Sequence, residues 1–231
     1  QLIEDHGKKS GKPILAHLNH PNFQWAVTAD DLAKVALGGY MEIYNGHPGI
    51  NHLGDATRPG DVKIWDIANT IRIAEMKTSP LYGVATDDSH TYHGGDVSPG
   101  RGWIVVGADE LGGDALINAM KAGKFYASSG VEIESIHFDD NNGKLFVKMK
   151  PVEGVTYSTE FIGTRKGYDA SAENTGIGEV FASVEGNNAA FKIPDDALYL
   201  RATINSSRKH PNPSYQGQKE QAWVQPVGWK K

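Results

Sequence analysis

Short apolar runs alternate with stretches of helical periodicity over the first 130 residues. Turn-forming residues bound four apolar runs, which predict buried strands: residues 14–18, 39–46, 81–86 and 103–108. Three segments between and after them predict helices: residues 28–37, 61–76 and 108–128. Thr28 precedes acidic residues, as a helix N-cap does, and Gly123 predicts a helix end. This order favours a parallel α/β layer structure or part of a barrel.

The pattern changes at about Val131. Short runs of alternating apolar and polar residues follow, at residues 133–138, 144–150, 156–163, 189–193 and 198–205. Turn-rich segments such as Asp140–Gly143 separate them, which is typical of an all-β sandwich. We therefore predict two domains, an α/β portion at residues 1–130 and a small β-sandwich at residues 131–231.

Composition narrows the function only by exclusion. The net charge of −5 and the lack of a long basic tract give no case for nucleic-acid binding, and no apolar run has membrane-spanning length. The chain contains no cysteine, which excludes disulfides and thiolate catalysis, but both a cytoplasmic and an exported location stay open. The sequence begins without Met or a signal-peptide pattern, so we expect it to be part of a longer chain.

Polar residues gather where three of the predicted strands end. They are His17, His20 and Asn22 after the first strand; Glu42, Asn45 and His47 at the second; and Asp87, Asp88, His90 and His93 after the third. Functional groups of α/β folds lie at the carboxyl ends of parallel strands. Imidazole and carboxylate groups are ligands for zinc, manganese or iron, so these strand ends predict a divalent-metal site.

The segments "HLNHPNF", "MEIYNGHP", "YGVATDDSH", "PGRGWIVV" and "FYASSGV" resemble the bacterial polymerase-and-histidinol-phosphatase (PHP) family of metal-dependent phosphoesterases. The resemblance implies a distorted (β/α) barrel, present here only in part because its N-terminal strands are missing, with a β-rich extension. It also implies that His20, Asp88 and His90 are metal ligands. Glu42 is expected beside the metals, and Asp87 in a turn or beside them.

The resemblance further implies hydrolysis of a small phosphate ester by metal-activated hydroxide. Arg101 is the candidate for binding phosphoryl oxygens, and His93 or His47 for donating a proton to the leaving group. The family's N-terminal His-x-His motif, Asp-His pair and bridging acid have no counterpart in this sequence. An isolated chain is therefore expected to be inactive unless that segment is supplied in trans.

Each candidate also has an ordinary structural interpretation. His20 could hydrogen-bond a loop, Asp88 could stabilise a turn, and Arg101 could form a structural salt bridge. The alternative function is a non-catalytic module that binds carbohydrate or protein, with the α/β portion as a remnant. The polar segment at residues 206–220 predicts a long loop that could cover the site. Substrate, metal and oligomeric state stay open.

Overall fold

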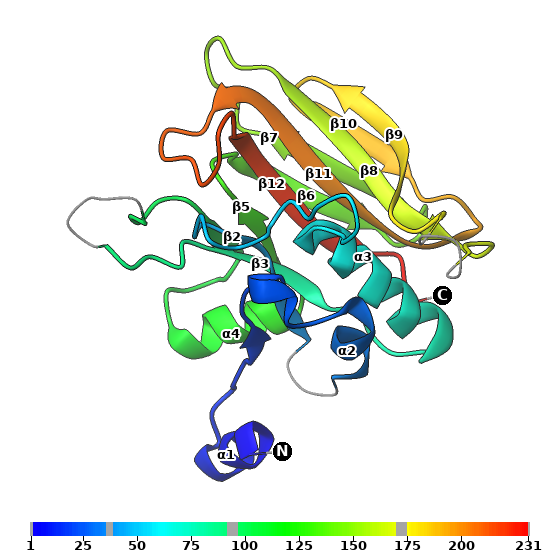
Figure 1. Cartoon of the computed structure of the whole chain (residues 1–231). Coiled ribbons are helices and arrows are strands. Elements are labelled where there is room, and N and C mark those ends of the chain that lie inside the picture. The colour runs from blue at the N-terminus through cyan, green and yellow to red at the C-terminus, as the bar shows by residue number, and fades with distance from the viewer. Residues whose placement is uncertain (1, 36–38, 92–96, 170–174, 231) are drawn as a thin grey trace.

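The computed structural model describes residues 2–35, 39–91, 97–169 and 175–230. In this part of the chain strand residues outnumber helical ones, and the strands form three sheets (Figure 1). The helices here are α1 (Leu2–Ser10), α2 (Ala29–Lys34), α3 (Asp61–Thr70) and α4 (Gly113–Lys121), with a 3-10 turn η1 (Phe23–Trp25) and a π-helical turn η2 (Ile71–Glu75). The prediction of an α/β fold with a partial (β/α) barrel is therefore wrong, and the protein has a β-rich fold.

The smallest sheet lies in the first half of the chain. It has the order β1 (His17–Leu18), β2 (Tyr40–Asn45) and β3 (Tyr82–Thr86), and both pairs are parallel. Every residue of β2 is buried, because β1 and β3 flank it and α3 packs against it. The short apolar runs at these positions thus do form parallel strands, and their carboxyl ends lie at one edge.

The largest sheet is antiparallel throughout. Its strand order is β4 (Trp103–Val106), β5 (Phe125–Ser128), β12 (Lys219–Val227), β11 (Ala197–Lys209), β8 (Tyr157–Arg165) and β9 (Glu179–Glu185). A third sheet, also antiparallel, has the order β10 (Asn188–Lys192), β7 (Lys144–Met149) and β6 (Ile133–Asp139). The expected junction near Gly130 falls between β5 and β6, and strands from both sides of it share the largest sheet. The division into two domains stays a prediction.

Strand β4 explains why the barrel prediction fails. Its apolar run resembles a strand buried on both faces, as parallel strands are. In the structure Trp103 and Val105 are exposed while Ile104 and Val106 are partly buried, so only one face is covered. Strand β4 pairs antiparallel with β5, a strand that the sequence analysis did not predict. The parallel sheet therefore stops at three strands.

Apolar side chains from two sheets form one large core. Leu145, Val147 and Met149 on β7 face Phe161 and Leu200 of the six-stranded sheet, and all five are buried. Alternate residues of β12 take part in this contact, namely Ala222 and Val224. The two antiparallel sheets thus pack face to face, in a sandwich-like arrangement.

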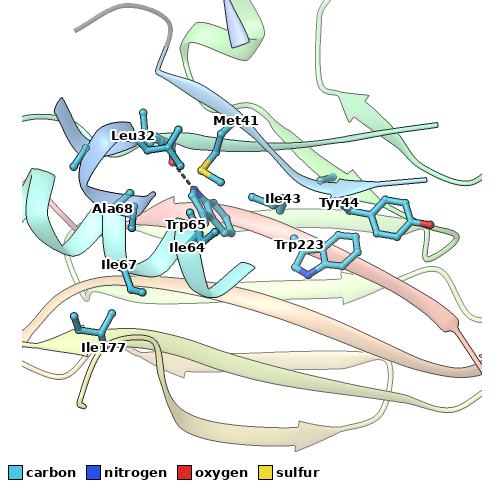
Figure 2. Packing of buried hydrophobic residues seen from close by; sticks show 14 of the residues in the cluster. Leu32, Met41, Ile43, Tyr44, Ile64, Trp65, Ile67, Ala68, Ile177 and Trp223 are labelled. Carbon is cyan, nitrogen blue, oxygen red and sulfur yellow. Dashed lines mark hydrogen bonds between the residues drawn. The ribbon is translucent and has the colours of Figure 1, made fainter. Parts of the chain in front are cut away.

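The other face of the six-stranded sheet packs on the parallel sheet and its helices. Figure 2 shows Trp65 of α3 and Trp223 of β12 in this second core, with Met41 and Ile43 of β2 beside them. Trp65 donates its Nε1 hydrogen to the Leu81 carbonyl oxygen at 2.8 Å. The six-stranded sheet is therefore covered on both faces, which fixes the parallel sheet and its strand ends relative to it.

A buried ion pair also joins helix α3 to the six-stranded sheet. Arg201 of β11 donates from Nε and Nη2 to the two oxygens of Asp66, at 2.7 and 2.6 Å. Tyr199 donates its hydroxyl hydrogen to the same carboxylate at 2.7 Å, and the Arg201 guanidinium lies 5.1 Å from the centre of the Trp65 ring. Asp66 and Arg201 are both almost fully buried, so solvent cannot stabilise their charges. Each side chain therefore depends on the other as its counter-ion.

No helix in the described ranges is both long and apolar enough to span a bilayer. Helix α1 buries none of its residues and extends away from the sheets (Figure 1).

The start of α2 provides a first testable prediction. Thr28 and Asp31 form a capping box, in which the Asp31 backbone N–H donates to Thr28 Oγ1 and the Thr28 backbone N–H donates to Asp31 Oδ2. We expect Thr28→Ala to lower the free energy of unfolding by about 1 kcal/mol, because helix-end N–H groups lose their acceptor. Urea denaturation followed by circular dichroism measures this. Thr28→Ser keeps the acceptor and should stay near wild type; equal losses in both variants would contradict the cap.

Candidate functional site

The carboxyl ends of β1, β2 and β3 bring polar residues together from three separate segments. His20 follows β1, Glu42 and Asn45 lie on β2, and Asp88 follows β3. The strands are parallel and adjacent, so their ends open on the same edge of the sheet. We name these four residues the strand-end cluster.

Glu42 is the centre of the strand-end cluster. Its side chain is buried, and its Oε2 accepts from the His20 backbone N–H at 2.5 Å and from Asn45 Nδ2 at 2.9 Å. Its Oε1 accepts from the Thr86 hydroxyl at 2.8 Å. All of these donors are neutral, and no lysine forms an ion pair with Glu42 among the described residues. The carboxylate instead ties the three strand ends together.

Asn45 connects the two acidic side chains of the cluster. Its Nδ2 group donates to Glu42 and also to Asp88 Oδ2, at 3.2 Å, while its Oδ1 accepts from the His47 backbone N–H at 2.8 Å. The side chain is almost fully buried, so it is held in this orientation. Hydrogen bonds therefore run from His20 through Glu42 and Asn45 to Asp88.

The backbone is strained at two of the predicted metal ligands. His20 has φ = 29° and Asp88 has φ = 46°, both in the left-handed region that residues with a side chain rarely adopt. Such strain often occurs at functional sites, where the surrounding structure holds it in place. Hydrogen bonds hold both residues here, through the His20 backbone N–H and the Asp88 carboxylate.

The predicted ligand pair of Asp88 and His90 lies close together. Asp88 Oδ1 and His90 Nδ1 are 4.0 Å apart, and the same nitrogen lies 2.8 Å from the Asp88 backbone oxygen. The His90 side chain is 64% exposed, and its ring meets the His47 ring edge-on at 5.1 Å. His90 and His47 thus extend the strand-end cluster toward solvent.

Asp87 and Arg101 hold the loops around the cluster. Asp87 Oδ1 accepts from the backbone N–H groups of Arg101 and Gly102, at 2.6 and 2.9 Å. Arg101 is buried, and it donates from Nη1 to the Gly46 carbonyl at 2.9 Å and from Nε to Asn212 Oδ1 at 3.2 Å. Two of its nitrogens are therefore committed to protein, and its expected role with phosphate stays a prediction. His93 lies outside the described residues.

The loop between β11 and β12, residues 210–218, lies against the site. Ser214 Oγ is 2.8 Å from the Tyr44 hydroxyl and donates to the Gly46 carbonyl at 2.9 Å. His210 Nδ1 accepts from the Asn212 backbone N–H, so its Nε2 carries the hydrogen that faces the Arg101 carbonyl at 3.1 Å. Residues 210–218 of the segment expected to form a long loop are thus anchored at the site by hydrogen bonds. Residues 206–209 and 219–220 of that segment instead belong to β11 and β12.

The sequence analysis missed a buried acid–imidazole pair next to the cluster. His52 Nδ1 lies 3.3 Å from Asp61 Oδ2, with Asp61 at the first position of α3 and fully buried. Burial raises the pKa of Asp61, the charge of Glu42 raises it further, and the contact with His52 opposes both. Nothing in the local pattern marks this pair, because His52 lies in an irregular loop.

Two of the predicted metal ligands, Asp88 and His90, lie close together. His90 Nδ1 is 4.0 Å from Asp88 Oδ1, but it faces the Asp88 carbonyl oxygen and therefore carries a hydrogen. Nε2 is thus the nitrogen of His90 that could bind a metal. His20 does not join them: in the described part of the chain, no three His, Asp or Glu side chains form a group that could hold a metal ion. A preformed three-ligand site is therefore absent from the described residues, and metal binding by Asp88 and His90 stays a prediction.

Comparisons with protein-family models, curated proteins and solved structures found no match for the chain. The fold and the strand-end cluster define a β-sheet-rich protein with a buried polar site at the ends of three parallel strands.

Proposed function

We propose that the protein is a metal-dependent phosphoester hydrolase whose catalytic site is the strand-end cluster. One divalent cation, Zn²⁺, Mn²⁺ or Fe²⁺, is held by Asp88 and His90, and water or a bound anion completes its coordination. When bound, such an ion activates water and offsets charge on phosphoryl oxygens. The resemblance of the strand-end segments to the PHP family supports this proposal.

The single observation that carries the proposal is the hydrogen-bonded path from His20 through Glu42 and Asn45 to Asp88. Glu42 and Asn45 are buried; Glu42 holds the His20 backbone N–H, and Asn45 holds the Asp88 carboxylate. Such partners fix the geometry of ligands around a metal. His47 accepts from the Gly49 backbone N–H through Nδ1, so its Nε2 carries a hydrogen that can be donated to a phosphoryl oxygen.

Metal binding provides the second prediction. We expect Asp88→Asn to weaken Mn²⁺ binding about tenfold or more, measured by calorimetric titration, because the amide is a poorer ligand than the carboxylate. Asp140→Asn makes the same chemical change in the exposed turn after β6 and should leave binding unchanged. Wild-type protein that binds no divalent metal, or Asp88→Asn that binds as tightly as wild type, would end the proposal.

Turnover of phenyl phosphate and p-nitrophenyl phosphate is then assayed in the full-length protein encoded by the gene. Hydrolysis should require the added metal and stop with a chelator. Metal binding without any turnover would leave a cation-binding protein and overturn the assignment as a hydrolase.

A further inference from the structure

We propose that His52, oriented by Asp61, is the general acid that protonates the leaving oxygen of a phosphate monoester of a small polar alcohol. This inference rests on the proposed function, and it assigns a residue and a substrate class that the resemblance does not supply.

A groove lies between the loop after β2 and the loop between β11 and β12. It has a volume of about 190 Å³, and its lining includes Asn45, His47, His52, Ser214 and Tyr215. Asn45 donates to Asp88, and the His47 ring contacts the His90 ring. One wall of the groove is therefore part of the proposed catalytic site, and His52 lies on the same lining.

The two nitrogens of His52 have different surroundings. Nδ1 faces the Asp61 carboxylate at 3.3 Å. Nε2 makes no hydrogen bond within the described residues, and it is not among the buried polar atoms that lack a partner. It therefore keeps some exposure to solvent, and His52 is one of the residues that line the groove. The ring is kept in place by the Tyr44 ring, which meets it edge-on at 5.0 Å.

Asp61 is suited to orient and stabilise a protonated imidazole. Its side chain has no solvent exposure, and its Oδ1 accepts no hydrogen bond of standard geometry among the described residues. The Asn22 backbone N–H makes only a weaker contact with the carboxylate, and a buried oxygen without a good partner is costly. A positive charge on His52 would offset it, as the carboxylate behind a catalytic histidine does in other enzymes.

The chemistry balances with water as the only co-reactant. The oxygen of a water molecule forms a bond to phosphorus, and the bond between phosphorus and the leaving oxygen breaks. The electron pair of that bond stays on the leaving oxygen, which takes the proton from His52 Nε2 and departs as the alcohol. The attacking water releases a proton to solvent, from which His52 is protonated again, and the other product is inorganic phosphate.

The size and lining of the groove define the substrate class. Pockets for drug-sized ligands measure about 300–1,000 Å³, so a groove of about 190 Å³ takes only a small group. Its amide, imidazole and hydroxyl groups suit an alcohol that itself carries hydrogen-bonding groups. An alkyl or sugar-like alcohol is a poor leaving group, which makes a general acid necessary.

Kinetics with two leaving groups tests the acid role. We expect His52→Gln to slow hydrolysis of phenyl phosphate about 10²-fold or more, while p-nitrophenyl phosphate, whose leaving group needs little protonation, changes far less. Asp61→Asn, at the positioning residue, should show the same selectivity for the poor leaving group. His137→Gln, on the exposed face of β6, is the matched control and should change neither rate. Added imidazole should restore phenyl phosphate turnover in His52→Ala.

A measurement on unaltered protein covers the case in which a variant fails to fold. Phenyl phosphate added to metal-free protein should shift the nitrogen resonance of His52 Nε2 and leave that of His137 in place. Absence of this shift, or equal slowing of both substrates by His52→Gln, overturns the inference and leaves the proposed hydrolase intact. Absence of metal-dependent turnover in wild type overturns the proposed function and the catalytic role of His52 with it.

Discussion

Asp66→Ala should lower the free energy of unfolding by about 3–5 kcal/mol, because it leaves the Arg201 guanidinium charged and buried without a counter-ion. Arg201 donates to both oxygens of Asp66 and is 1% exposed, so solvent cannot replace the lost partner. Tyr199 also loses the acceptor of its hydroxyl hydrogen. Urea denaturation followed by tryptophan fluorescence gives the change directly.

Two comparisons show whether burial is the cause. Glu134→Ala removes one partner of the Lys148–Glu134 pair, in which both side chains are 48% exposed, and should cost about 1 kcal/mol or less. The double variant Asp66→Leu with Arg201→Met removes both charges at once and should lose less than Asp66→Ala, since no charge is left unpaired. A loss for Asp66→Ala no greater than that for Glu134→Ala would refute this account of the buried pair.

Trp223→Ala should lower the free energy of unfolding by about 3–5 kcal/mol, the usual cost of emptying a buried tryptophan site. Trp223 is 1% exposed, and its ring stacks on the Tyr44 ring with centres 5.7 Å apart (Figure 2). The Tyr44 hydroxyl is in turn hydrogen-bonded to Ser214 and Gln218. The variant therefore removes a support of both β2 and the loop over the groove.

Trp103 on β4 provides the matched control. It is 38% exposed, so Trp103→Ala should cost about 1 kcal/mol or less. Thermal and urea denaturation of the two variants measure the difference. Similar losses at both positions would mean that contacts of Trp223 with the parallel sheet add little to stability.

Local patterns predicted elements well where the signal is contained in one segment. The capping box at Thr28 and the apolar runs of β2 and β3 are of this kind, as are most strands after Val131. Local patterns failed for strands whose hydrogen-bonding partners are distant in sequence. Strand β12 carries Lys219, Glu220 and Pro226, which weaken its strand signal, yet it forms the centre of the largest sheet by pairing with β5 and β11.

The sequence likewise predicted only part of the candidate site. The rule that functional groups follow parallel strands located Glu42, Asn45 and Asp88 at one edge of a sheet. It gave no sign that the Asn45 amide would stand between two carboxylates, since that depends on side-chain orientation. His52 and Asp61 escaped notice because a loop of irregular sequence brings them together.

The pairing of β5 with β12 has a consequence for how the chain is made. Ala127 lies opposite Trp223, so β5 stays without one neighbour until β12, which lies far downstream, has emerged from the ribosome. Long-range pairings of this sort slow folding and leave apolar strands open to other chains.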